Sequence, residues 1–510
     1  MSDIRAEEGS SRGEPAGPAA AAPAPSLKSR VVGGSFWTVV RFGLTNLVRL
    51  ATNIVLTRLL MPEAFGLMAL VSTLMTGLAM FSDMGLSASV VQNDRDDEDF
   101  LHTAWTLQVV RGGILWCFAA LFSELMTLVY GLPELRLLIL VGGLTTVIAG
   151  FNSMALHRMR RNLEIRKLAL IDVSGQLLAG TATVACAFQW PSAWALVWGG
   201  IFGGIAKLVI SHLAAEGLRP RFGWETTARA ELLTFGKWIF ISTILFFLAG
   251  QSDRLIFGKL LSISTLGVFS IAVTLAVIPA QIVWQIGNSV LFPALSRARR
   301  AAGGVDRVYQ RMARPILAIG VLPAACLGAV GPELIEILYD PRYADAGWMI
   351  QILAVGAWLQ VPQASSGAAV LAMGEPRWLA IANGTKFLGM IVFLPIGYAG
   401  FGPGGAIAGL VGAEFFRYVA LTVGVRRFGM RGLGADLAFT LLALVATALG
   451  WITAQWIGVE GGGALLRLAG AVAMIAGVMG AAAAIVFRRE LSGLIEQLRG
   501  VARPTGHSHV

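Results

Sequence analysis

The sequence predicts an all-α integral membrane protein with about fourteen transmembrane helices. Of its 510 residues, 56% are apolar and 14% are charged, whereas a soluble domain has about 45–50% and about 25%. The mean hydropathy is +0.70. So few charged residues do not cover the surface of a soluble protein of this length, and a disordered chain would be poorer in apolar residues. Both of those classes are therefore excluded.

Apolar segments of about 20 residues, the length that crosses the hydrocarbon core, recur along the chain. We expect each of these segments to form one membrane-spanning helix. The predicted spans are 34–57, 65–90, 103–129, 135–155, 168–188, 193–214, 233–252, 266–290, 314–331, 347–372, 378–398, 404–424, 436–457 and 464–487.

The spans are expected to form two six-helix lobes followed by a helix pair. Residues 1–30 combine Ala, Pro, Gly and Ser with scattered charges and lack a continuous apolar stretch, which predicts a disordered cytoplasmic tail rather than a cleaved signal peptide. The other divisions are an N-terminal lobe at 31–222, a C-terminal lobe at 223–430, the helix pair at 431–490 and a cytoplasmic tail at 491–510.

A weak internal repeat favours this division into lobes. Thr57-Arg58-Leu59-Leu60 and then Phe65-Gly66 join spans 1 and 2, and Asp253-Arg254-Leu255-Ile256 and then Leu266-Gly267 join spans 7 and 8. Repeated halves are typical of transporters whose lobes rock about a central site.

The distribution of arginine predicts the topology. Alternate connections, at 158–167, 219–229, 297–314 and 426–431, are rich in arginine, as is the C-terminal tail. By the positive-inside rule these connections are cytoplasmic, so both termini of this multi-pass protein are expected to lie inside. The net charge of +10 follows from this topology, and no basic patch interleaved with aromatic residues indicates nucleic-acid binding.

Span 1 carries a polar stripe. At 100° per residue its polar side chains fall within an arc of roughly 140°. They are Ser35, Thr38, Arg41, Thr45, Asn46, Arg49, Thr52 and Asn53. Arg49 lies roughly 22 Å from the inner end at 1.5 Å per residue. An arginine at that depth costs at least about 2.5–3.5 kcal/mol unless it is hydrated or paired, so the stripe indicates the wall of a water-filled cavity or a pairing with a carboxylate of another helix.

The excess of cations within the spans predicts the charge of the ligand. A cavity lined by arginine favours an anion, and a guanidinium matches the oxygens of a phosphate group. An amphiphile with a phosphate head fits such a cavity beside lipid, and an inside-negative potential drives an anion outward. The sequence therefore predicts export of a phosphorylated amphiphile, with Arg41, Arg49 and Asn53 among the substrate-binding residues.

Three carboxylates, Asp83, Asp172 and Asp253, are candidates for coupling transport to an ion such as H⁺ or Na⁺. Asp83 shares a stripe with Ser72 and Thr76 on span 2, which is compatible with a buried proton site. A solvated helix end is the alternative interpretation of the same residue.

Several signatures of enzymes and cofactor sites are absent from the sequence. It lacks the Gly-rich phosphate-binding motif of nucleotide hydrolases, a Ser-His-Asp set and a cluster of metal ligands. The longest outer connection, at about 331–346, is short for a catalytic loop that acts on sugars. We therefore expect no catalytic residue, no metal and no cofactor.

Several short motifs resemble a known family. The order and spacing of these motifs are matched over roughly residues 31–300. They are Trp37-x3-Arg41-Phe42-Gly43, Thr57-Arg58-Leu59-Leu60-x-Pro62-Glu63-x-Phe65-Gly66, Phe81-Ser82-Asp83-x-Gly85-Leu86-x-Ala88, Gln92, Trp194-Ala195-Leu196-Val197, Asp253-Arg254-Leu255-Ile256-x-Gly258-Lys259, Leu266-Gly267-x-Phe269-Ser270-x-Ala272 and Phe292-Pro293-Ala294. In combination they resemble the polysaccharide flippases of the MOP exporter superfamily, close to the Wzx and colanic-acid-exporter-like branch.

This resemblance implies a V-shaped pair of six-helix bundles that translocates undecaprenyl-diphosphate-linked oligosaccharide by alternating access. It also implies a cationic cavity, coupling to an ion gradient rather than to ATP, and a polysaccharide polymerase and co-polymerase as partners. Arg41 and Arg254 match positions of the motifs and are expected to bind substrate, whereas Arg49 is inferred from the polar stripe.

Two alternatives stay open at this point. A multidrug-type cation antiporter of the same fold would need acidic rather than basic residues deep in the cavity. A membrane-embedded glycan polymerase or ligase would need a catalytic outer loop.

Overall fold

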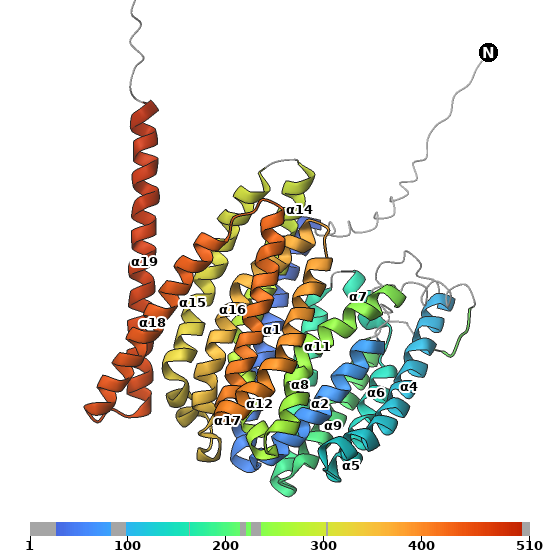
Figure 1. Cartoon of the computed structure of the whole chain (residues 1–510). Helices are drawn as coiled ribbons and strands as arrows, with labels where there is room; N and C mark the ends of the chain where they lie inside the picture. The colour runs from blue at the N-terminus through green and yellow to red at the C-terminus, as the bar shows by residue number, and fades with distance from the viewer. Residues whose placement is uncertain are drawn as a thin grey trace, which may run out of the picture.

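The computed structural model of the chain describes residues 27–82, 98–162, 164–214, 221–225, 236–301 and 304–501. Within these ranges every regular element is a helix, which confirms the predicted all-α class. Most of the helices run side by side in one bundle, with α18 and α19 at one side of it (Figure 1).

The N-terminal half consists of the helices from α1 to α9. They are α1 (Leu27–Leu59), α2 (Pro62–Ser82), α4 (Glu98–Tyr130), α5 (Glu134–Gly142), α6 (Leu144–Gly150), α7 (Ala155–Arg161), α8 (Ile165–Gln189) and α9 (Ala193–Leu213). The predicted span 135–155 is split into α5 and α6, and α7 is bent by 62° from this pair.

The C-terminal half consists of the helices from α11 to α17. They are α11 (Gly236–Leu260), α12 (Ile263–Ala276), α13 (Ile278–Ile286), the π-helix η1 (Gly287–Leu291), α14 (Phe292–Arg300), α15 (Val305–Leu338), the short 3₁₀-helix η2 (Pro341–Tyr343), α16 (Ala346–Ala372) and α17 (Arg377–Arg427). The stretch from α12 to α14 corresponds to one predicted span that is interrupted twice.

Helix α17 folds back on itself as a hairpin. Its 51 residues contain non-helical backbone at Phe401 and Gly402, and Gly402 has a φ of 61°, which favours glycine. The two arms approach so closely that a Cβ atom on Gly397 would meet the carbonyl oxygen of Gly405, and one on Gly405 would meet that of Gly397. The predicted spans 378–398 and 404–424 are therefore the two arms of α17.

The last two helices, α18 (Leu433–Val459) and α19 (Ala464–Val501), pack against α15. Arg467 of α19 forms ion pairs with Glu333 and Glu336 of α15, at 3.4 Å and 2.9 Å. Helix α19 continues beyond the predicted span into the segment predicted as a tail, and in Figure 1 it extends past the other helices.

Within the described ranges, nine helices are long and apolar enough to cross a membrane, or ten if α5, α6 and α7 form one bent span. The chain is therefore a multi-pass membrane protein. The total of fourteen spans and the lobe boundaries remain predictions.

Among the described residues, the two halves share a hydrophobic core at one end of the bundle. The largest cluster joins residues of both halves, such as Leu60 and Phe65 with Phe257 and Phe269. It lies at the end that carries the α1–α2 and α15–α16 connections, which the positive-inside rule places outside and which we call the outer end. Toward the other, inner end, the clusters contain residues of one half each.

The outer ends of α2 and α12 meet through two glycines of the internal repeat. A Cβ atom on Gly66 would overlap the carbonyl oxygen of Ile263, and one on Gly267 would overlap that of Pro62. The contact is reciprocal, so the repeated motifs lie face to face where the two halves touch.

Candidate functional site

A cavity of about 600 Å³ lies mainly in the C-terminal half, with Phe42 of α1 in its wall. Its lining includes three cations, two carboxylates and seven carboxamides. These polar residues are Arg254, Lys386 and Arg417, then Asp253 and Glu414, then Gln251, Gln281, Gln285, Asn288, Gln360, Gln363 and Asn383. The cavity therefore combines these polar side chains with an otherwise apolar lining, and its charged residues have an excess of one positive charge.

An ion cluster on the α17 hairpin forms one wall. Glu414 is only 2% exposed, and its carboxylate pairs with Lys386 at 2.6 Å and with Arg417 at 3.2 Å. Arg417 also donates to Gln363 Oε1 at 2.8 Å and to Asn383 Oδ1 at 3.2 Å. Burying a carboxylate in an apolar bundle is tolerated here because two cations compensate its charge.

Asp253 and Arg254 of α11 line the same cavity but are not paired with each other. Asp253 is 9% exposed, and its Oδ1 atom has no hydrogen-bond partner among the described residues. Arg254 donates a hydrogen bond to Gln251 Oε1 on the preceding turn. The structure thus places two of the predicted site residues, one from each charge class, in one cavity.

A second ion cluster lies in the N-terminal half. Asp172 of α8 accepts from Arg41 of α1 at 3.0 Å and from Lys207 of α9 at 2.9 Å. These side chains are between a quarter and two fifths exposed and do not line the cavity. Arg41 and Asp172, predicted for substrate binding and for coupling, are therefore brought to each other.

Arg49 lies on the same face of α1 as Phe42, two helical turns further on. It donates a 2.8 Å hydrogen bond to Asn46 Oδ1, and Asn46 in turn donates to the carbonyl oxygen of Phe42. Among the described residues no carboxylate forms an ion pair with Arg49. Of the other predicted site residues, Asn53 is half-buried on α1, and Asp83 lies outside the described residues.

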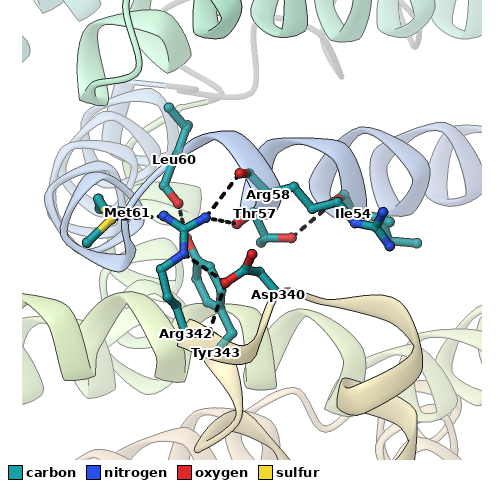
Figure 2. A network of polar contacts seen from close by, with 8 residues as sticks. All are labelled: Ile54, Thr57, Arg58, Leu60, Met61, Asp340, Arg342 and Tyr343. Carbon is teal, nitrogen blue, oxygen red and sulfur yellow. Dashed lines mark hydrogen bonds and ion pairs between the residues drawn. The ribbon is translucent and has the colours of Figure 1, made fainter.

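The loop before α16 clamps the end of α1 at the outer end, as Figure 2 shows. The guanidinium of Arg342 donates to the carbonyl oxygens of Thr57 and Arg58, at 3.4 Å and 3.0 Å. Asp340 accepts from the Nε atom of Arg342 at 2.8 Å and orients it. The Tyr343 hydroxyl donates to the carbonyl oxygen of Leu60 at 3.0 Å. The last carbonyls of a helix have no partner within the helix, and this loop satisfies them.

A second clamp joins the outer ends of α4 and α11. Tyr130 donates through its hydroxyl to the carbonyl oxygen of Leu255 at 2.9 Å, and Lys259 donates to that of Val129 at 2.7 Å. The ring of Tyr130 packs where a Cβ atom on Gly258 would stand. Each half therefore holds the end of the other half's first helix.

Sequence reasoning missed the carboxamides of the cavity. The signal was present, because Gln281, Gln285 and Asn288 recur at helical spacing within one predicted span. Neutral amides cost less than charges within a membrane span, so their pattern is less conspicuous than that of the arginines.

The fold is that of known multi-pass transporters. The structure matches lipid II flippase MurJ in an inward closed conformation with a TM-score of 0.72, over 89% of this chain and 99% of that one at 11% identity. It matches an inward-facing multidrug resistance MATE family transporter of the MOP superfamily with a TM-score of 0.59, over 79% and 98% of the two chains at 13% identity.

The sequence comparisons specify the family. The chain is 24% identical to lipopolysaccharide biosynthesis protein WzxC of Escherichia coli (strain K12), over 65% of this chain and 67% of that protein. It is 22% identical to succinoglycan biosynthesis transport protein ExoT of Rhizobium meliloti (strain 1021), over 70% and 73%. The profile described as polysaccharide biosynthesis protein matches residues 55–347, and the chain belongs to that family. The resemblance indicated by the motifs is confirmed.

Proposed function

We propose that this protein is a flippase that moves an undecaprenyl-diphosphate-linked oligosaccharide from the inner to the outer leaflet of a bacterial inner membrane. The product would feed exopolysaccharide or lipopolysaccharide assembly. The cavity carries the proposal, because its volume of about 600 Å³ is lined by carboxamides and by an excess of positive charge inside an apolar helix bundle. The names of the relatives, which concern lipopolysaccharide and succinoglycan, support the same substrate class.

The substrate's charge fits the lining of the cavity. A diphosphate is an anion that a guanidinium binds through paired hydrogen bonds. Arg254 lines the cavity, and among the described residues its side-chain partner is the neutral Gln251, whereas Lys386 and Arg417 share Glu414. We assign Arg254 the first contact with the diphosphate and place Arg49 on its path along α1.

The shared core supports an alternating-access cycle. In this structure the two halves are joined at the outer end and have separate cores toward the inner end. The cavity would then receive its substrate from the inner leaflet, with the prenyl tail remaining in the lipid. Rocking of the halves would separate the outer contacts and release the head group on the other side.

Coupling to an ion gradient is assigned to Asp253. Asp253 lines the cavity, and the buried Oδ1 atom of its carboxylate has no hydrogen-bond partner among the described residues, whereas Asp172 is already neutralised by two cations. Replacing Asp253 with Asn is expected to abolish the response of transport to an imposed H⁺ or Na⁺ gradient while the lipid-linked glycan still binds. Transport by reconstituted vesicles under each gradient is the measurement, and unchanged gradient dependence would refute the assignment.

The two alternatives have less support. A cation antiporter is disfavoured because cations outnumber carboxylates in the cavity lining. A polymerase or ligase is disfavoured because the outer connection between α15 and α16 is only residues 339–345, and in it Arg342, oriented by Asp340, binds the end of α1. A polysaccharide polymerase and co-polymerase are better placed as separate partners that receive the flipped lipid.

The proposal is tested by the location of lipid-linked glycan in cells. A strain lacking this protein should accumulate the glycan lipid in the inner leaflet, and the wild-type chain should restore export. Arg254→Ala should restore little of it because the diphosphate loses its guanidinium partner. The matched control is Arg136→Ala, which removes an exposed arginine paired with Glu124 away from the cavity. Normal leaflet distribution in the deletion strain would overturn the proposal.

A further inference from the structure

One wall of the cavity presents carboxamides and an indole ring side by side. Gln281, Trp284 and Gln285 lie on α13 at spacings of three and four residues, which places them on one helix face. Gln360 of α16 lines the same cavity. We call these four residues the carboxamide face.

The three glutamines of this face are free for a ligand. Their side chains are partly exposed, and no described residue forms a hydrogen bond with them. Gln363 and Asn383, in contrast, are buried and are engaged with Arg417 and with the backbone of Glu414. Gln363 and Asn383 therefore support the ion cluster, whereas the side chains of Gln281, Gln285 and Gln360 have no hydrogen-bond partner among the described residues.

The indole ring of Trp284 adds an apolar surface to these amides. It is 56% exposed although it lies in the wall of a cavity within an apolar bundle. An aromatic face together with carboxamides suits a ligand that has an apolar ring face and a rim of hydroxyl groups. Each carboxamide offers both donors and an acceptor, and hydroxyls also act as both, so the match does not depend on charge.

The backbone beside this face is irregular in a way that is frequent at functional sites. The π-helix η1 follows α13 directly, and Pro293, which cannot donate to a preceding carbonyl, stands just after it. Asn288 donates to the carbonyl oxygen of Trp284 at 3.1 Å, so that its amide braces the same turn. The irregular turn thus adjoins the ligand-facing residues.

We infer that the carboxamide face recognises the sugar residues of the transported glycan, whereas the cations of the cavity bind its diphosphate. The inference rests on the proposed function and adds the residues that distinguish a glycosylated lipid from a bare one. Neutral hydrogen bonds to hydroxyl groups would select among sugars, because an unmatched hydroxyl leaves a carboxamide unpaired.

The test measures binding by the full-length protein in lipid nanodiscs. The probes are undecaprenyl diphosphate and the undecaprenyl-diphosphate-linked glycan extracted from a strain that lacks the protein. The double variant Gln281→Met/Gln285→Met should bind the glycosylated probe about tenfold more weakly, as expected for the loss of two neutral hydrogen bonds, and should bind the bare lipid as wild type does. Arg254→Gln should weaken binding of both probes.

The matched control is Gln189→Met, an exposed glutamine at the end of α8, which should change neither affinity. Wild-type preference for the glycosylated probe in the double variant would overturn the inference, as would an equal loss of both probes. In either case the proposed function stands, because the wild-type chain still binds the glycosylated lipid. Wild-type protein that binds neither probe would instead refute the proposed function, and the inference with it.

Discussion

The hydroxyl of Tyr343 donates a 3.0 Å hydrogen bond to the carbonyl oxygen of Leu60, and this contact ties the loop before α16 to the end of α1. The hydroxyl of Tyr130 makes the corresponding 2.9 Å contact with Leu255 at the end of α11. Tyr130 directly follows the third predicted span, 103–129, and Tyr343 lies in the connection after span 314–331. Each tyrosine binds the first helix of the other half. Each half therefore contributes one tyrosine contact that closes the outer end.

Weakening the Tyr343 contact is expected to favour separation of the outer ends. Tyr343→Phe removes one hydrogen bond, worth about 0.5–1.5 kcal/mol. Arg342→Ala removes a different set of contacts, those of its guanidinium with the carbonyl oxygens of Thr57 and Arg58. The population with separated outer ends should rise about 2- to 10-fold in Tyr343→Phe. Distances between spin labels at the exposed residues Leu128 and Phe401 report this change.

Tyr398→Phe is the control for this experiment, because Tyr398 is half-buried on α17 and takes no part in either clamp. An unchanged distance distribution in Arg342→Ala would show that the clamp does not hold the outer end closed.

Substitution of Gly66 or Gly267, the two glycines where α2 and α12 meet, should sterically prevent the outer ends from closing. Alanine at Gly66 would place a methyl group against the carbonyl oxygen of Ile263, and alanine at Gly267 would do so at Pro62. Because a backbone carbonyl cannot move aside as a side chain can, either variant should keep the outer ends apart and reduce export of the glycan lipid at least tenfold. Gly113→Ala, whose Cβ atom would meet no neighbour within 4 Å, should export normally. Normal export by both interface variants would contradict the prediction.

Removing the carboxylate of the buried ion cluster should destabilise the protein. Glu414→Gln leaves Lys386 and Arg417 without their compensating charge, and loss of one partner of a buried pair costs about 3–5 kcal/mol. The melting temperature in detergent should fall by several degrees. Glu124→Gln breaks the exposed pair with Arg136 and should cost at most about 1 kcal/mol. A smaller shift in Glu414→Gln than in Glu124→Gln would show that the cluster does not support the fold.

The contact of Asp340 and Arg342 with the end of α1 should be insensitive to pH in the physiological range. Hydrogen bonds from the side chain and then from the backbone N–H of Arg342 hold the pKa of the Asp340 carboxyl below its usual range. A carboxyl whose pKa is lowered in the folded state contributes above its ordinary pKa, about 3.9, and loses that contribution as the pH falls through the lowered value. The Leu128–Phe401 label distance should therefore be constant from about pH 8 to about pH 5 and change only below about pH 4. A change near pH 6 would indicate that another group controls the clamp.

Much of the architecture could be predicted because a span is a local property. The apolar segments that predict spans 378–398 and 404–424 correspond to the two arms of α17, and Gly402 between them allows the reversal. The π-helix after α13 could not be predicted in this way, because its Gly287 lies close to the backbone of Ala364 on α16, a contact between segments far apart in the sequence.

The candidate site was predicted only in part. Asp253 and Arg254 do line the cavity, but Arg41 pairs with Asp172, and the sequence stripe does not reveal which neighbour faces each residue. A neutral carboxamide costs less free energy within a membrane span than a charged residue does, so it stands out less in the sequence.

The sequence by itself determined that the chain is helical, crosses the membrane many times and carries an excess of cations within the predicted spans, since hydrophobic length and charge are carried by each segment alone. Only the tertiary structure decided which cations are neutralised, which amides stay free and at which end the halves meet. Those properties depend on residues far apart in the chain, such as Leu60 and Tyr343, and packing alone brings them together.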